Sequence, residues 1–230
     1  MSAPADRPDV LLLDVNETLS DTAPMAAAFE DVGAPGALAA TWFAGVLRDG
    51  FARTAAGAAA PFADVAAGGL RAVLEGVDGL GPDLDEAVSR LMEAFVQLPA
   101  HPDVAPGLAA LRAGGLRLAT LTNGAPAVSD GLLRRAGARD SVEQLLSVQD
   151  APGGAWKPAS TAYEHGLRAT GVGAERALLV AVHPWDVDGA ARAGLRTAWI
   201  DREGRAYPRH LLAPDLTAPS LPALAELLSR

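Results

Sequence analysis

Short apolar runs that end at polar residues alternate with helical stretches along most of this chain of 230 residues. The first run, Val10–Leu13, stops at Asp14, and later runs occupy residues 116–122, 177–182 and 195–200. Apolar runs as short as these are typical of strands buried on both faces of a parallel sheet. Because parallel strands need helical crossovers between them, the sequence predicts an α/β fold with a parallel sheet and helices on both faces.

A long helical segment interrupts this alternation after the first strand. Residues 21–99 carry helical patterns separated by Pro and Gly, without a convincing strand among them. Asp21 and Thr22 are candidate N-caps of its first helix. Helices are predicted at 25–30, 37–60, 62–74 and 84–98. We expect a core domain of residues 1–20 and 100–230, and a helical cap domain of residues 21–99 placed to cover the mouth of a crevice.

The second half of the chain returns to alternating strands and helices. Strands are predicted at 116–122, 145–148, 177–182, 195–200 and near 216. Helices are predicted at 104–113, 126–136, 160–169, 188–193 and 221–228. The length of the chain suits one α/β core that carries a smaller insertion.

Charge and cysteine content exclude several classes of function. The net charge is -9, which gives no electrostatic reason to bind nucleic acid or an anionic membrane. The sequence has no cysteine, so it has neither a disulfide framework nor thiolate chemistry. Met1–Pro8 is polar, and the apolar run after it is too short to span a membrane. We expect a cytoplasmic protein that acts on a small molecule.

Polar residues mark the ends of the predicted strands in a fixed order: Asp14, then Thr122 and Asn123, then Lys157, then Asp186. In open α/β sheets the ligand crevice lies outside the carboxyl ends of the strands, so these side chains are expected to share one crevice. A carboxylate there can serve as a covalent nucleophile, and this role is assigned to Asp14. Alternatively, Asp14 only caps its strand, and Thr122 is only a helix N-cap.

Each of the other residue types suits a supporting role. Thr18 and Thr122 carry hydroxyl groups that can donate to the carboxylate oxygens of Asp14. Lys157, the only lysine in the sequence, would lower the pKa of Asp14 and stabilise a bound anion. Asp186 would hold the Lys157 ammonium group or position water.

The order and spacing of these residues resemble the four sequence motifs of the haloacid dehalogenase (HAD) superfamily, beginning with Asp14 and Thr18 as D-x-x-x-T. The resemblance covers nearly the whole chain. It implies a Rossmann-like core with a helical cap inserted after the first strand.

Two departures from the phosphatases of this superfamily indicate a branch. Phosphatases carry a general acid where Asn16 stands, and an amide has no titratable proton to give. They bind magnesium with a further acid, whose place is taken by Val182, and an isopropyl group offers no oxygen ligand. Both losses favour metal-free chemistry, as the 2-haloacid dehalogenase branch implies. Tyr163 and Trp185 match a polar tyrosine and a substrate-pocket tryptophan of that branch, although both are also ordinary core residues.

Three departures from the dehalogenase pattern lie at expected substrate-binding positions. Asn16 replaces a tyrosine, and His183 replaces an asparagine. Phe43 stands where the dehalogenases carry the arginine that binds the substrate carboxylate and the halide. Arg48 or Arg53, on the same predicted helix, is a hypothetical substitute. His183 is either a ligand-facing group or a histidine bonded to backbone.

The sequence thus predicts a hydrolase in which Asp14 displaces halide from a small carboxylic acid through an aspartyl ester, without a cofactor. One alternative is a phosphatase, which would need magnesium. Another is a partner subunit that no longer hydrolyses, or one that acts on another leaving group. The apolar faces of the cap are wide enough to allow a homodimer.

Overall fold

The computed structural model describes residues 7–229, and it contains a six-stranded sheet with all strands parallel. The strands lie in the order β3-β2-β1-β4-β5-β6, so β1 is central, and the strands after β3 are added on the other side of it. Their bounds are β1 Val10–Leu13, β2 Arg117–Thr122, β3 Gln144–Ser147, β4 Ala177–Ala181, β5 Arg196–Ile200 and β6 Leu216–Ala218. The predicted α/β class is confirmed.

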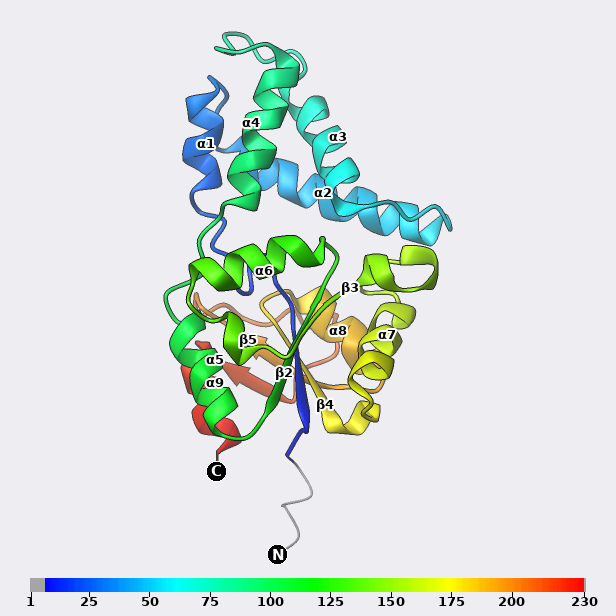
Figure 1. Ribbon diagram of the computed structural model, residues 1–230. Coiled ribbons are helices and arrows are strands. Elements are labelled where there is room, and N and C mark those ends of the chain that lie inside the picture. The colour runs from blue at the N-terminus through cyan, green and yellow to red at the C-terminus, as the bar shows by residue number, and fades with distance from the viewer. Residues whose placement is uncertain (1–6, 230) are drawn as a thin grey trace, which may run out of the picture.

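Helices cover both faces of the sheet (Figure 1). Successive side chains of β1 point to opposite faces of the sheet. Leu11 and Leu13 therefore belong to one buried cluster, and Val10 and Leu12 belong to another. The first cluster includes α5 (Val104–Ala113), α6 (Pro126–Arg135) and α9 (Leu221–Leu228). The second includes α7 (Ser160–Thr170) and α8 (Pro184–Arg192). Short 3-10 turns lie at Arg139–Ser141, Val148–Asp150, Pro152–Gly154 and Ala174–Arg176.

Four helices between β1 and α5 form a separate layer above the carboxyl ends of the strands (Figure 1). They are α1 (Met25–Asp31), α2 (Leu38–Ala55), α3 (Phe62–Leu74) and α4 (Leu84–Val96). We call them the cap helices. Their apolar faces share one buried cluster, and Ser20 pairs with Ala100 in an antiparallel bridge where the chain leaves and re-enters the core. The proposed boundaries at 20/21 and 99/100 stay a prediction, and residues 1–6 of the expected core lie outside the described residues.

Two element ends differ from the sequence prediction by more than two residues. Helix α2 ends at Ala55, earlier than the predicted 60, and α8 begins at Pro184, earlier than the predicted 188. Pro184 takes the first position of α8, where a proline costs no hydrogen bond. Asp186 therefore lies in the first turn of a helix.

The expected N-cap of α1 is wrong. Pro24 occupies the cap position, where no side chain makes a capping bond. Asp21 accepts instead from the Ala23 N–H, and the Thr22 hydroxyl donates to Glu17. Within residues 7–229, no helix is both long and apolar enough to cross a membrane.

Candidate active site

The centre of the site is a buried lysine held between two aspartates. Lys157 Nζ lies 2.8 Å from Asp14 Oδ1 and 2.6 Å from Asp186 Oδ2. The side chains of Lys157 and Asp186 are 0% exposed, and that of Asp14 is 5% exposed. Three residues that are far apart in sequence thus meet at the carboxyl edge of the sheet, because the carboxyl ends of parallel strands share that edge.

Opposing influences set the protonation of this cluster. Burial alone raises the pKa of Asp14, but the charges of Lys157 and His183 and the hydrogen bonds from Lys157 and Thr18 bring it below the ordinary value. Burial lowers the pKa of Lys157, and the two aspartates more than reverse this. For Asp186, burial and the charge of Asp14 keep the pKa raised despite Lys157. Asp14 is therefore ionised and Lys157 is charged at neutral pH.

Thr18 fixes the second oxygen of the nucleophile candidate. Its hydroxyl donates to Asp14 Oδ2 at 2.6 Å and accepts from the Val182 N–H at 3.0 Å. The end of β1 and the end of β4 are therefore joined through this one hydroxyl.

Thr122 and Asn123 lie in the same site, with contacts other than those expected. Thr122 Oγ1 accepts from the Gly124 N–H at 3.0 Å, so it stabilises the turn that leads into α6. Asn123 Oδ1 accepts from the Lys157 N–H at 2.9 Å, and its amide nitrogen lies 3.4 Å from the Lys157 carbonyl oxygen. Asn123 thus positions the backbone that carries the lysine.

Tyr163 is buried against Asp186. Its hydroxyl donates to Asp186 Oδ1 at 2.6 Å, and its pKa is raised well above the ordinary value by burial and by the charge of Asp186. Both carboxylate oxygens of Asp186 are consequently engaged, one by Lys157 and one by Tyr163.

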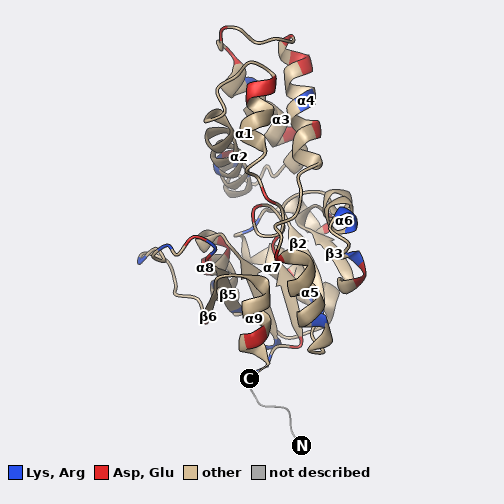
Figure 2. Cartoon of the chain, turned by 90° about the vertical axis from the view of Figure 1, so that its left-hand side faces the viewer, with Lys and Arg blue, Asp and Glu red and all other residues tan. Residues whose placement is uncertain are grey.

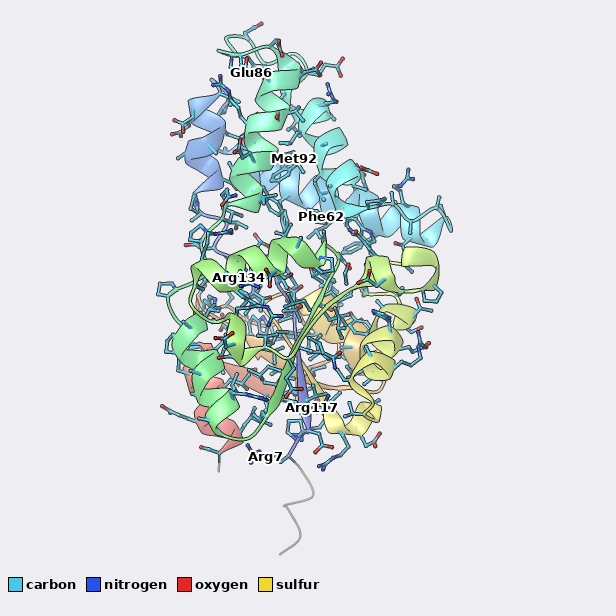
Figure 3. All side chains as sticks on the ribbon, in the orientation of Figure 1. Arg7, Phe62, Glu86, Met92, Arg117 and Arg134 are labelled. Atoms are coloured by element: carbon cyan, nitrogen blue, oxygen red, sulfur yellow. The ribbon has the colours of Figure 1, made fainter. Side chains whose placement is uncertain are left out.

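Three of the expected substrate-binding residues, Asn16, Phe43 and His183, line three different cavities. Asn16 and Thr122 line a small cavity of about 100 Å³ between the core and the cap, with Phe62 and Phe95 opposite them. Phe62 lies at the edge of the cap that faces the core (Figure 3). Phe43 is buried, and it lines a cavity of about 440 Å³ at α1 and α2.

Neither candidate cation of the cap reaches these cavities. Arg48 is 75% exposed and is bonded to Asp49, on the face of α2 that points away from the buried residues. Arg53 is exposed as well. Among the residues that line the small cavity, none carries a positive charge.

His183 and Trp185 form a ring stack beside the site, with centroids 5.0 Å apart. Trp185 also contacts Phe51 of α2, so this stack reaches the cap. His183 Nε2 lies 3.3 Å from the Asn16 carbonyl oxygen and 3.4 Å from Glu17 Oε2.

Sequence reasoning missed Glu17 and Trp156. Glu17 has φ +62°, a left-handed conformation that costs a non-glycine residue roughly 1–2 kcal/mol. Trp156 directly precedes Lys157, stacks on Phe62 at 5.4 Å and donates through Nε1 to the Ala60 carbonyl oxygen. The sequence did show a large aromatic residue directly before the only lysine. Such a residue can pack between the cap and the core, and this was the signal that could have identified Trp156.

The residues present do not suit magnesium. The place between Asp14 and Asp186 is occupied by the Lys157 ammonium group, and the neighbouring Val182 offers only backbone. No group of three or more His, Asp or Glu side chains arranged to hold a metal ion occurs among residues 7–229. A hard divalent cation requires more oxygen ligands than this cluster leaves free.

Comparison with known proteins identifies the family. The profile of the haloacid dehalogenase-like hydrolases matches residues 8–194. Haloacetate dehalogenase H-2 of Moraxella sp. (strain B) is 38% identical over 148 residues, which are 64% of this chain and 65% of that protein. (S)-2-haloacid dehalogenase 1 of Pseudomonas sp. (strain CBS-3) is 30% identical over 225 residues, which are 95% of this chain and 92% of that protein.

A solved structure extends the likeness to three dimensions. The L-2-haloacid dehalogenase from Xanthobacter autotrophicus with chloropropionic acid covalently bound is 25% identical, with a TM-score of 0.86 over 96% of this chain and 98% of that one. The match to the first of these relatives spans just under two thirds of its length. The family predicted from the strand-end motifs is confirmed: this chain belongs to the haloacid dehalogenase-like hydrolases.

Proposed function

We propose that the protein hydrolyses the carbon–halogen bond of a small 2-haloacid through an ester on Asp14. The observation that carries this proposal is the Asp14–Lys157–Asp186 cluster, which presents an ionised carboxylate, together with the amide of Asn16 where a phosphatase needs an acid for its alcohol leaving group. The names of the similar proteins, haloacetate dehalogenase and (S)-2-haloacid dehalogenase, support the same substrate class.

In the first step, an Asp14 carboxylate oxygen attacks the halogen-bearing carbon from the side opposite the halogen. The new carbon–oxygen bond forms as the carbon–halogen bond breaks, and the halide leaves with the bonding electron pair. Thr18 and Lys157 hold the carboxylate so that little reorganisation is needed at the moment of attack. In the second step, water adds to the Asp14 carbonyl carbon and releases the 2-hydroxyacid.

An anionic substrate must approach a chain that is acidic overall. Acidic residues lie on α4 and on the segments that join the cap to the core (Figure 2). The buried charge of Lys157 offsets the charge of Asp14, so the nucleophile repels an anionic substrate less. The cavity beside Asn16 and Thr122 is small enough to favour a short-chain acid. The reaction proposed here uses no metal ion.

Isotope labelling tests the ester mechanism. One turnover of chloroacetate or 2-chloropropionate, with enzyme in excess and in ¹⁸O-water, is expected to place the label in the Asp14 peptide and not in the product. Label that appears directly in the hydroxyacid would overturn the proposal, because water would then have attacked the substrate itself.

Two variants serve as controls. Asp14→Asn is expected to abolish halide release, because an amide is a poor nucleophile at carbon. Asp21→Asn removes an acid outside the cluster and should leave halide release unchanged. Adding a chelator should have no effect on the wild-type rate of halide release, whereas hydrolysis of an aryl phosphate that a chelator abolishes would favour the phosphatase alternative.

A further inference from the structure

Every carbonyl oxygen of the turn after β1, residues 15–19, accepts a hydrogen bond; we call this segment the β1 turn. The Val15 oxygen accepts from the Leu19 N–H inside the turn at 2.8 Å. Donors outside the turn reach the other four oxygens: His183 at Asn16 (3.3 Å), His101 at Glu17 (3.0 Å) and at Leu19 (2.9 Å), and Arg202 at Thr18 (2.7 Å). These donors come from three distant segments of the chain, so the surrounding structure fixes the conformation of the turn.

The β1 turn carries the hydroxyl that fixes the nucleophile. The Thr18 hydroxyl donates to Asp14 Oδ2 at 2.6 Å, and Thr18 is 0% exposed. The preceding residue, Glu17, has φ +62°, which a non-glycine residue keeps only where its surroundings impose it. A turn that relaxed from this conformation would carry the Thr18 hydroxyl away from Asp14.

Arg202, in the loop after β5, makes the shortest of the contacts from outside the turn. Its Nη2 donates to the Thr18 carbonyl oxygen at 2.7 Å, and its Nη1 donates to Asp103 Oδ2 at 2.7 Å. Asp103 Oδ2 also accepts from the Leu221 N–H at 2.9 Å. Because Asp103 caps α5 and Leu221 begins α9, the guanidinium joins the β1 turn to the starts of two core helices. A planar fork of donors suits two acceptors at fixed positions, and the single ammonium group of a lysine does not.

Arg202 lies away from the cavity in which we place the substrate. The small cavity beside Asn16 and Thr122 does not have Arg202 in its lining. Arg202 lines a separate hollow of about 520 Å³ instead, and its side chain is 18% exposed. Arg202 can therefore influence the reaction only through the residues that it holds. The hollow also gives a small cation access to this place when the side chain is shortened.

We propose that Arg202 is a positioning residue for the displacement of halide, an inference that rests on the proposed function. Arg202 fixes the Thr18 carbonyl oxygen, and the backbone of the β1 turn then keeps the Thr18 hydroxyl on Asp14 Oδ2. The carboxylate is thereby held in the orientation needed for attack before the substrate arrives. Holding a reacting group in place in this way lowers the barrier without any contact to the substrate.

A double-mutant cycle tests whether Arg202 acts through Thr18. The quantity measured is the rate of halide release in the first turnover (the halide burst), followed by rapid quench. Thr18→Val removes the hydroxyl and keeps the shape, and it is expected to slow the burst about 10²-fold, whereas Arg202→Ala slows it about 10-fold. The double variant should be no slower than Thr18→Val alone, because the group that Arg202 positions is already absent. Losses that multiply would overturn the proposal.

The dependence on substrate concentration separates positioning from binding. In Arg202→Ala, the haloacid concentration that gives half of the maximal burst rate should stay within about twofold of wild type, while the maximal rate falls. Arg205→Ala is the matched control, because Arg205 lines the same hollow and pairs with Glu203 at the surface. Its burst rate should equal that of wild type. A burst rate within about twofold of wild type in Arg202→Ala as well would overturn the proposal.

Guanidinium rescue shows whether the lost group is the donor fork itself. Millimolar guanidinium chloride is expected to restore part of the burst rate in Arg202→Ala and none in Thr18→Val. Arg202→Lys keeps the charge and loses the fork, so its burst rate should lie between those of wild type and Arg202→Ala. Arg202→Lys also replaces Arg202→Ala in the cycle if the alanine variant does not fold. If the wild type gives neither a halide burst nor labelled Asp14, the proposed function fails, and the role of Arg202 fails with it.

Discussion

Replacing Gly50 by alanine tests whether the contact between α2 and Trp156 holds the site together. Trp42, Val46 and Gly50 follow one another at i,i+4 spacing along the buried face of α2. A Cβ atom at Gly50 would lie 2.1 Å from Trp156 Cζ3, whereas carbon atoms pack at about 3.5 Å. The ring would have to move by roughly 1.4 Å, although it is only 1% exposed.

The expected magnitude follows from the contacts of Trp156. Forcing such a ring aside costs about 1–3 kcal/mol of overpacking. Weakening its hydrogen bond to Ala60 adds about 0.5–1.5 kcal/mol. The better helix propensity of alanine returns about 1 kcal/mol. We expect a net loss of about 0.5–3.5 kcal/mol in the free energy of unfolding, which lowers the Tm by roughly 1–14 °C for a chain of this size.

The matched control is Gly68→Ala in α3. Gly68 is exposed inside a helix, and a Cβ there would meet nothing within 4 Å. The same chemical change should therefore raise stability by about 0.5–1 kcal/mol. Thermal unfolding measures both variants. A Gly50→Ala protein as stable as Gly68→Ala would refute the packing argument.

Activity should separate the two variants as well. Trp156 directly precedes Lys157, whose N–H is held by Asn123. A displacement of about 1 Å at a catalytic group can cost 10²-fold in rate. We expect the halide burst to slow by roughly 10- to 100-fold in Gly50→Ala and to stay at the wild-type rate in Gly68→Ala.

Two further predictions concern the charges of the site. Lys157→Met leaves Asp14 and Asp186 facing each other without a cation, so urea unfolding at pH 7 should show a loss of about 3–5 kcal/mol. That loss should shrink at pH 4, where the carboxylates of the variant take up protons because Lys157 no longer stabilises their charge, and an equal loss at both pH values would contradict this explanation. The lowered pKa of Asp14 keeps its carboxylate ionised below pH 3.8, and the raised pKa of Lys157 keeps its ammonium charged above pH 10.5. The rate of the halide burst, measured by rapid quench, should therefore be flat from about pH 5 to 9, and a fall inside that window would assign the acid or base limb to another group.

Local sequence signals predicted most of the secondary structure because Pro and Gly mark the element ends. Helices α3, α5 and α9 have the predicted bounds, and a proline or a paired glycine stands at or next to an end of each. The sequence predicts a start of α8 that is four residues too late, because a proline after a strand suits a turn equally well, whereas Pro184 is the first residue of the helix.

The candidate site was predictable to the extent that it depends on topology. Once the strands are parallel, the residues after β1, β2 and β4 must share one edge, so Asp14, Asn123 and Asp186 were expected together. The partners of individual side chains were not predictable. The contact of Glu17 with His183 joins residues 166 positions apart, and it depends on the left-handed backbone at Glu17. No sequence periodicity carries that information, because the contact follows from how two loops pack.

Phe43 stands where the resembled dehalogenases carry an arginine, and this changes what the cap contributes to the proposed reaction. Phe43 packs against Trp42 and Phe95, with ring centroids 6.2 Å apart in each pair, so the cap carries an aromatic cluster at this point. An apolar wall binds no anion, but it excludes water and lowers the local dielectric. A low dielectric strengthens the field of a buried cation, and the side chain of Lys157 is 0% exposed. We infer that the charge developing on the halide is stabilised from the core side, by Lys157 and the polar strand ends, while the cap acts by desolvation.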